Sequence, residues 1–249
     1  MLRRQGTKDG INAKIRVYFP SHTSYVEPFF GAGGMFFNKP LVKYNCVNDN
    51  DSEVFNLFQV IQNHLEEFKQ QFEDTPINED LLRHWKENKE IEPIMKAVRF
   101  VFLSNYTLFG KMGTLNSSVN SNHKSLYLVD LKHIQSHIKN THFFNHDFRD
   151  FLRIIAIEEC STFIYADPPY ITTNANYTGF TEQDSLDLFD SLEAKKCKWA
   201  MSEFDNPFIL NQAKDRGLNV IIIGERRNIN NRRTEILVTN YKTPNKSLI

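Results

Sequence analysis

The residues of this chain best suited to chemistry are Asp167, Pro168, Pro169 and Tyr170, which directly follow the apolar run Phe163–Ala166. Such a run predicts a buried strand, and ligands of open α/β sheets bind at the carboxyl ends of strands. Two consecutive prolines fix φ and donate no backbone N–H, so nearby carbonyl oxygens can accept hydrogen bonds from a ligand. The carboxylate and the Pro168 carbonyl suit a planar substrate with an amino group, which the Tyr170 ring can stack against.

A second candidate segment is a glycine turn that follows the predicted strand Ser24–Phe29. Gly31 and Gly33 let the backbone bend tightly and approach a ligand closely. Their spacing is not that of a dinucleotide-binding fingerprint, which has another glycine three residues further on. Glu27, just before the turn, is placed to hold a cationic group of a ligand. A helix is expected to begin at Met35, and a purely structural glycine turn is the alternative.

Two further predicted strands also end in an acidic residue. Asp49 follows the strand Asn45–Val47, where an acid of a βαβ unit can bind ribose hydroxyls. Asp147 follows the strand Thr141–Asn145 and could accept a hydrogen bond from an adenine amine while Phe148 packs on the base. Either acid could instead cap a helix or form a turn. An acid at the end of each of four successive strands favours one shared ligand site.

These positions require an α/β fold in which helices cover both faces of a mainly parallel sheet. Apolar runs alternate with amphipathic helical stretches along the chain, which is the pattern of such a sheet. Besides the strands above, the predicted strands are Thr162–Ala166, Lys198–Ser202, Asn219–Ile223 and Glu235–Thr239, and the predicted helices are Ser52–Phe72, Phe148–Ile157, Glu182–Leu192 and Pro207–Arg216.

The alternation breaks between about residues 72 and 139. This stretch has helical patterns at Asn78–Asn88 and Glu92–Leu103, followed by a segment rich in glycine, serine and asparagine at 109–122. A polar segment of this length inside a compact domain is more often functional or disordered than structural. We therefore interpret residues 57–139 as a domain inserted between the second and third strands, and residues 1–56 and 140–249 as the main domain.

The composition indicates a folded cytoplasmic protein. Of its 249 residues 41% are hydrophobic and 13% aromatic, which excludes a disordered chain. The three cysteines have no CxxC spacing, so we expect reduced thiols and no metal site. The polar, basic N-terminus lacks the apolar core of a signal peptide, and no apolar stretch approaches the roughly 20 residues of a membrane span. The net charge is zero, but local basic clusters are compatible with phosphate contact.

In this order, the motifs resemble the Dam-like class of DNA adenine-N6 methyltransferases, which use S-adenosylmethionine. The Asp-Pro-Pro-Tyr motif is specific for amino-methyltransferases, and the resemblance covers nearly the whole chain. It implies a Rossmann-like methyltransferase sheet of seven mainly parallel strands with helices on both faces and an inserted, mainly helical DNA-recognition subdomain. The matching segments are Gly6–Lys8, Glu27–Gly33, Asn48-Asp49, Asp147-Phe148, Asp167–Tyr170 and Thr234–Tyr241.

The resemblance also implies how the cofactor is held. The glycine turn and Phe29 would line the methionine portion, with Glu27 and Lys8 near its charged end. Asp49 would hold the ribose, and Asp147-Phe148 the cofactor's adenine. The full set of implied cofactor-binding residues is Lys8, Glu27, Phe29, Gly31, Gly33, Asp49, Asp147, Phe148 and Asp167.

The target adenine would be flipped out of the duplex and stacked on Tyr170. An exocyclic adenine amine is a poor nucleophile because its lone pair is delocalised into the ring. Asp167 and the Pro168 carbonyl would accept hydrogen bonds from this amine, push it toward tetrahedral geometry and free the lone pair for in-line attack on the sulfonium methyl. This chemistry requires neither a metal nor a covalent enzyme intermediate.

The DNA sequence that the chain reads stays open, because the insertion lacks the Arg/Asn/Phe/Pro-rich segment of Dam proteins that read GATC. Asn105 could cap a turn rather than contact a base, and the arginines could lie in a solvated loop. Tyr177 and Phe180 could shape the flipped-base pocket, although core packing is expected of Phe180. The candidate contacts to bases or phosphates are Asn105, Lys111, Asn116, Arg226, Arg227, Arg232 and Arg233.

Other readings change the substrate or the class of protein. The same fold could methylate an RNA adenine, a cytosine amine or a protein amide, but Asp at position 167 favours adenine. A catalytically silent nucleic-acid-binding homologue would not need the intact Asp-Pro-Pro-Tyr motif. A nicotinamide dehydrogenase is disfavoured because the glycine spacing is not that of a dinucleotide-binding fingerprint. We expect a monomeric, stand-alone enzyme of a bacterium or phage that acts on double-stranded DNA. Whether a restriction enzyme accompanies it in a restriction-modification pair is left open.

Overall fold

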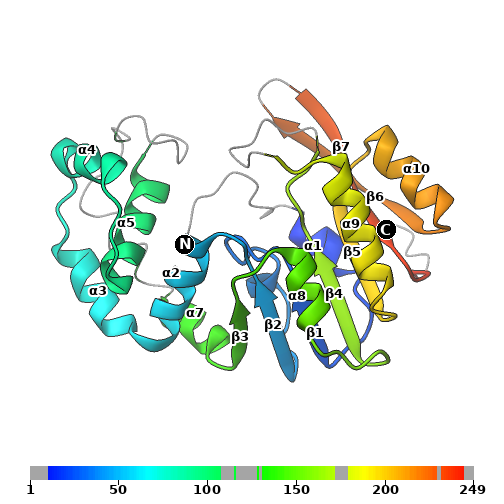
Figure 1. Cartoon of the computed structure of the whole chain (residues 1–249), viewed down its shortest axis with the longest axis horizontal. Coiled ribbons are helices and arrows are strands. Elements are labelled where there is room, and N and C mark those ends of the chain that lie inside the picture. Colours follow the sequence, from blue (N-terminus) through cyan, green and yellow to red (C-terminus); the bar gives the residue numbers. More distant parts are fainter. Residues whose placement is uncertain are drawn as a thin grey trace. The chain divides into compact units, whose positions relative to one another are not determined.

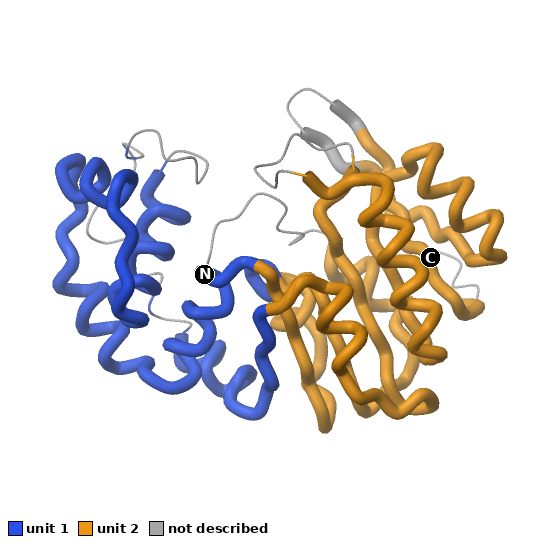
Figure 2. Tube along the Cα trace, viewed as in Figure 1, with its two compact units in different colours: residues 1–7, 31–33, 51–145 blue, residues 8–30, 34–50, 146–249 orange. Residues whose placement is uncertain are grey.

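The computed structural model describes residues 11–107, 115, 128, 131–171, 179–228 and 231–243, without the side chains of residues 226–228 and 231–232. The chain divides into two compact units (Figure 2). The helical unit contains residues 51–145 together with 31–33, and the sheet unit contains the remaining described residues. The predicted insertion, 57–139, lies within the helical unit. Among the described residues, no helix is long and apolar enough to span a membrane.

The described strands form one seven-stranded sheet in the order β3-β2-β1-β4-β5-β7-β6 (Figure 1). Strand β1 pairs in parallel with β2 and β4, and β4 pairs in parallel with β5. Strand β7 lies antiparallel between β5 and β6. The sheet is therefore mainly parallel, as predicted. The strands are β1 Ser24–Glu27, β2 Tyr44–Asn48, β3 Thr141–Phe144, β4 Thr162–Ala166, β5 Lys198–Phe204, β6 Asn219–Asn228 and β7 Asn231–Thr239.

The centre of this sheet is formed by β1 and β4. Every residue of β4 is buried, which explains its continuous apolar sequence, because parallel strands are covered on both faces. Ser24 of β1 pairs with Tyr44 on one side and with Thr162 on the other. The carboxyl ends of β2, β1 and β4 consequently meet at the same edge of the sheet.

The longer helices of the sheet unit begin at side-chain caps that are visible in the sequence. Thr181 and Asp184 form a reciprocal capping box at the start of α9. Asn206 caps α10, whose first residue is Pro207, and Gly217 follows this helix with φ at +66°. The helices are α1 Asn12–Arg16, α8 Phe148–Ile154, α9 Glu182–Glu193 and α10 Pro207–Asp215, with a 3-10 turn η1 at Phe36–Asn38.

Two helix predictions were wrong. The segment expected to form one helix from Ser52 to Phe72 breaks at His64, where φ is −135°, although its apolar spacing continues on both sides. The helix expected from Met35 is limited to the short turn η1, because Pro40 follows within one turn and restricts the preceding residue to extended backbone. The helices of the helical unit are α2 Ser52–Asn63, α3 Leu65–Asp74, α4 Glu79–Glu87, α5 Pro93–Tyr106 and α7 Leu131–Ile138.

The helical unit has a core of its own around α4 and α5. The indole of Trp85 packs edge-on against Phe102, with 5.1 Å between the ring centroids. Arg99 is 5% exposed, and its guanidinium donates to the carbonyl oxygens of Trp85 and Asn88 near the end of α4. This cation therefore stabilises a helix terminus with unpaired carbonyl groups and is not presented to a ligand.

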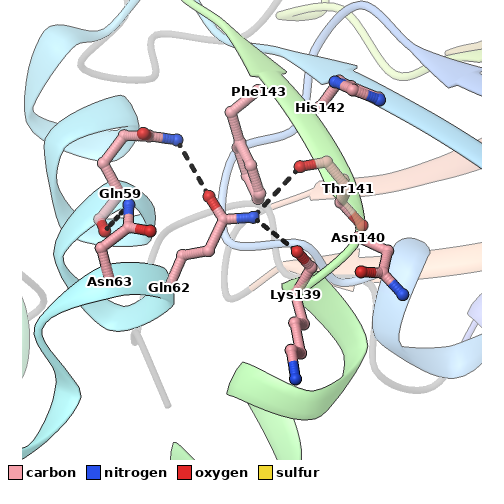
Figure 3. Close-up of a pocket in the computed structure, with 8 residues that line it drawn as sticks. All are labelled: Gln59, Gln62, Asn63, Lys139, Asn140, Thr141, His142 and Phe143. Carbon is pink, nitrogen blue, oxygen red and sulfur yellow. Dashed lines mark hydrogen bonds between the residues drawn. The ribbon is translucent and has the colours of Figure 1, made fainter.

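A pocket of about 720 Å³ also opens in the helical unit, between α2 and the segment that joins α7 to β3 (Figure 3). The Gln62 side-chain amide donates to the carbonyl oxygens of Ile138 at 2.6 Å and Thr141 at 3.2 Å. These bonds tie the helix to the turn, so Gln62 has a structural role here. The lining residues are Gln59, Gln62, Asn63, Lys139, Asn140, Thr141, His142 and Phe143.

Candidate active site

Three of the predicted carboxylates lie together at the carboxyl edge of the sheet. Glu27 is the last residue of β1, while Asp49 and Asp167 directly follow β2 and β4. Both aspartates contribute to raising the pKa of Glu27, because each adds negative charge near it. The convergence of these acids, predicted from four successive strand ends, is thus present for these three.

Glu27 is 2% exposed and accepts a hydrogen bond from the hydroxyl of Tyr25 at 2.8 Å. Burial raises the pKa of Glu27 to about 8, since a low-dielectric surrounding disfavours the charged form. A protonated carboxyl is consequently the main form of Glu27 at neutral pH. A cationic ligand at this position would favour ionisation of the carboxyl.

A buried lysine, Lys39, lies near enough to Glu27 for their charges to interact. Lys39 is 5% exposed, and its ammonium lies 3.9 Å from the centroid of the Tyr25 ring, a cation–π contact. It also donates to the Asn45 side chain and to the Pro40 carbonyl, each at 3.2 Å. Burial lowers the pKa of Lys39 to about 8, and the charge of Glu27 opposes this shift. Lys39 was not predicted as a site residue, because its position in a turn between predicted elements carries no sequence pattern.

The glycine turn needs glycine at two positions. Gly31 has φ at +55° and Gly33 has φ at +72°, values that side chains with a Cβ rarely adopt. The segment before the turn is held by Asn48, at the end of β2. Its side-chain amide donates to the carbonyl oxygens of Pro28 and His146, each at 3.0 Å, and its side-chain oxygen accepts from the His146 N–H at 3.0 Å. Asn48 therefore joins the segments that follow β1 and β3.

Three aromatic rings gather next to these segments. The centroid of the Phe29 ring lies 5.3 Å from that of Phe148 and 6.0 Å from that of Phe180, and Phe148 lies 6.0 Å from Phe180. Phe29 and Phe180 are half-buried, which leaves part of each ring accessible. Core packing was expected of Phe180, but its ring lies in this cluster with the two predicted cofactor-binding rings.

Asp147 has a structural role in the sheet unit. Its carboxylate caps α8 by accepting from the Arg149 N–H at 2.9 Å and also pairs with the Arg149 guanidinium at 3.1 Å. The same guanidinium pairs with Asp184 and Asp187 and packs over the Phe148 ring at 4.4 Å. The helix-cap alternative for Asp147 is thus correct. Its contact with adenine stays a prediction.

In the Asp-Pro-Pro-Tyr segment, Tyr170 lies between two carboxylates. Its hydroxyl is 2.5 Å from Oε1 of Glu235 and 3.2 Å from Oδ1 of Asp167. Its ring packs edge-on against Phe204, with 4.6 Å between centroids. Burial, followed by the charges of Asp167 and Glu235, raises the pKa of Tyr170 well above its ordinary value, so the hydroxyl keeps its proton. Pro168 is buried and Pro169 half-buried beside it.

The predicted DNA contacts are only partly described. Arg226 pairs with Arg233 and Arg227 with Arg232 across the β6–β7 ladder, and the guanidinium of Arg233 lies 5.3 Å from the centroid of the Phe204 ring. Asn105 is 3% exposed near the end of α5, so it would have to become accessible before it could contact a base. Lys8, Lys111, Asn116 and Tyr177 lie outside the described residues.

Glu235 and Tyr25 were not predicted as members of the site, although Glu235 lies within the matching segment Thr234–Tyr241. Both residues lie within strands, where the alternation of the sequence predicts which side chains are buried but not which residues they contact. Glu235 directly precedes the apolar run Ile236–Val238 of β7 and is 0% exposed, and an acid next to a buried run was the available signal. No group of three or more His, Cys, Asp or Glu side chains in the described part of the chain is arranged to hold a metal ion.

The sheet order, with an antiparallel seventh strand between the fifth and sixth, and the acids at its carboxyl edge define a Rossmann-like methyltransferase. A family model described as D12 class N6 adenine-specific DNA methyltransferase matches residues 5–238, and the chain belongs to this family. The protein is therefore an enzyme that methylates DNA adenine at N6.

Two relatives found by sequence similarity are themselves named as methyltransferases. The DNA adenine methylase of Escherichia coli (strain K12) is 25% identical over 193 residues, which cover 72% of this chain and 68% of that protein. The type II methyltransferase M1.LlaDCHI of Lactococcus lactis subsp. cremoris is 25% identical over 275 residues, covering 95% and 93%. Among solved structures, an rRNA methylase from Streptococcus thermophilus matches at 9% identity with a TM-score of 0.43, over 94% of this chain and 96% of that chain.

Proposed function

We propose that the methyl donor is S-adenosylmethionine and that it binds at the carboxyl edge of β1 and β2. The observation that carries this proposal is that Glu27, Asp49 and Asp167 end three adjacent parallel strands, while Phe29, two residues after Glu27, packs against Phe148. These groups match a ligand that combines an ammonium, a ribose and a planar base. S-adenosylmethionine supplies a methyl group activated by attachment to a sulfonium.

Each cofactor-binding residue then has a distinct role. Glu27 and Lys8 lie near the charged end of the methionine portion, which Phe29 and the turn of Gly31 and Gly33 line. Asp49, half-buried after β2, accepts hydrogen bonds from the ribose hydroxyls. Asp147 and Phe148 hold the adenine. To these we add Phe180, because its ring lies within 6.0 Å of both Phe29 and Phe148.

For catalysis we assign Asp167 and the Pro168 carbonyl as acceptors for the amine of a flipped-out target adenine, which stacks on Tyr170 while Pro169 keeps the segment rigid. Accepting the amine hydrogens localises the nitrogen lone pair. S-adenosylmethionine, when bound, would supply a methyl group on a sulfur that keeps the electron pair of the bond it loses, and Asp167 would lie on the side where the amine releases one proton.

Recognition of double-stranded DNA is assigned to the helical unit and to the β6–β7 hairpin. Four arginines form two cross-strand pairs on this hairpin, Arg226 with Arg233 and Arg227 with Arg232, which concentrates basic residues there. Basic residues gathered in this way suit phosphate groups, and we infer that these four arginines contact the DNA backbone. Base contacts are left to Asn105, Lys111 and Asn116. We further infer that the enzyme acts as a monomer in the cytoplasm.

Transfer of a labelled methyl group from S-adenosylmethionine to mixed double-stranded DNA, followed by nucleoside analysis, tests the proposal. N6-methyladenine in the duplex is the expected product, and label that appears only in RNA or in single strands would overturn the assigned substrate. Asp167→Ala should abolish transfer with most cofactor binding retained, whereas Asp205→Ala is the control, an exposed aspartate that follows β5. Retained turnover in Asp167→Ala would refute the role of that carboxylate.

Asp49→Ala tests the ribose contact. We expect weaker binding of S-adenosylmethionine in calorimetric titrations and little change in DNA affinity, because Asp49 is assigned to the cofactor alone. An unaltered cofactor affinity would argue against this contact.

A further inference from the structure

A buried carboxylate outside the Asp-Pro-Pro-Tyr motif contacts its tyrosine. Glu235 of β7 is 0% exposed, and its Oε1 lies 2.5 Å from the hydroxyl oxygen of Tyr170. In the antiparallel pairing of β5 with β7, Glu235 is directly opposite Phe204. Opposed residues of antiparallel strands lie on the same face of the sheet. The ring of Tyr170 packs edge-on against Phe204, so one strand pair holds this tyrosine at both its ring and its hydroxyl.

The hydroxyl of Tyr170 also lies within reach of Asp167. Its oxygen is 3.2 Å from Oδ1 of Asp167, a longer distance than the 2.5 Å to Glu235. A phenol has a single proton to donate, and of two possible acceptors the one at the shorter distance forms the stronger hydrogen bond. The proton therefore goes mainly to Glu235.

We propose that Glu235 is a positioning residue for methyl transfer, which acts through Tyr170. By accepting the hydroxyl proton, Glu235 fixes the tyrosine ring against which the target base stacks. It also keeps this hydroxyl from competing with the target amine for the lone pairs of Asp167. The inference rests on the proposed roles of Asp167 and Tyr170 in catalysis.

Removing Glu235 should redirect the tyrosine hydroxyl. In Glu235→Leu, which has a side chain of similar size and no acceptor, the hydroxyl of Tyr170 can donate only toward Asp167. The single-turnover rate of methyl transfer should then fall about tenfold or more, the effect of one misdirected hydrogen bond. Affinity for S-adenosylmethionine should be unchanged. Glu235→Gln keeps a weaker acceptor in the same place and should be intermediate.

A double-mutant cycle with Tyr170→Phe separates this role from a purely structural one. Phenylalanine keeps the ring and removes the hydroxyl, so in this background Glu235→Leu should change the single-turnover rate less than about twofold. Glu203→Gln is the matched control. Glu203 is a buried carboxylate of β5 that pairs with Ile236, which places it on the opposite face of the sheet. Any effect of this control should persist in the Tyr170→Phe background.

The outcomes are distinct. Equal rate losses from Glu235→Leu in the wild-type protein and in the Tyr170→Phe variant would show a structural role and overturn the proposal, as would an unchanged rate when Glu235→Leu is the single substitution. If Glu235→Leu does not fold, the same cycle with Glu235→Gln decides by the same criterion. Failure of the wild-type protein to methylate DNA adenine would instead reject the catalytic assignments on which the inference rests.

Discussion

Substitution of Glu27 by glutamine should change how the stability of the enzyme depends on pH. Glu27 is 2% exposed, and burial raises its pKa to about 8 from the ordinary value of 4.5. Between pH 5 and 8 the unfolded chain has lost this proton and the folded protein retains it. The free energy of unfolding therefore decreases as the pH rises through this interval. Glutamine resembles the protonated carboxyl and can still accept the Tyr25 hydrogen bond, so Glu27→Gln should lack this contribution.

The size of the effect follows from the raised pKa. A full proton difference changes the free energy of unfolding by about 1.4 kcal/mol per pH unit, which gives about 2.5 kcal/mol between pH 5 and pH 7. For a chain of this size that corresponds to roughly 5–10 °C in Tm. The lowered pKa of Lys39, about 8, adds stability only as the pH rises from about 8 toward 10.5 and does not enter this interval. Burial also lowers the pKa of His22, but that contribution is common to both proteins.

Calorimetric melts of the wild-type protein and Glu27→Gln at several pH values between 5 and 7 provide the test. The difference in Tm between variant and wild type should grow steadily with pH. Glu159→Gln, which alters an exposed carboxylate in the turn before β4, is the control and should track the wild type. Parallel curves for Glu27→Gln and the wild type would refute the reasoning that Glu27 is buried as a neutral acid.

Three further predictions concern the supports of the site. Asn48→Ala removes three hydrogen bonds at the ends of β1 and β3 and should lower the free energy of unfolding by about 2–4 kcal/mol. It should also weaken S-adenosylmethionine binding, and an unchanged calorimetric affinity would show that the loops keep their shape without Asn48. Arg149→Met keeps an apolar side chain over Phe148 but loses three ion pairs, and it should lower the free energy of unfolding by about 1–2 kcal/mol at low salt. An equally large loss of stability in 1 M salt would exclude an electrostatic origin. Gly31→Ala should lower the free energy of unfolding by about 1 kcal/mol because of the left-handed backbone alone, since an added Cβ meets nothing within 4 Å. Gly34→Ala should leave the stability nearly unchanged, and equal melting temperatures for the two variants would contradict this account.

The strand ends were predictable because they combine two local signals, an apolar run and a polar residue directly after it. Asp49 and Asp167 were located this way, whereas Glu27, inside the predicted strand Ser24–Phe29, was located by its place just before the glycine turn. The alternation of strands and helices predicted a mainly parallel sheet, in which the strands of these three acids are neighbours. The roles that the family resemblance adds to these acids stay predictions. Asp147 shows the limit of the signal, since a strand-end acid is equally suited to cap the next helix, as it does here.

The contacts of Glu235 and Lys39 could not be predicted from sequence, because each depends on the pairing of distant segments. Tyr170 and Glu235 are brought together by β7 entering the sheet beside β5, and the antiparallel register decides which residue of β7 is opposite Phe204. Strand periodicity predicts a buried face but gives no register between distant strands. Similarly, no local sequence pattern predicts the break between α2 and α3 at His64.

The division of the chain also determines the order in which its parts can form during synthesis. The helical unit is nearly contiguous, 51–145, whereas the sheet unit draws on segments from both sides of it. Strand β1 requires β4, because Ser24 pairs with Thr162, and β5 requires β7 at the far end of the chain. Because the chain emerges from the ribosome in sequence, the helices between β2 and β3 can fold before β3 and β4, which flank β2 and β1 in the sheet, have been synthesised. The carboxylates at the edge of the sheet would assemble last, so the helical unit of a nascent chain could fold before the site that we propose for methyl transfer is complete.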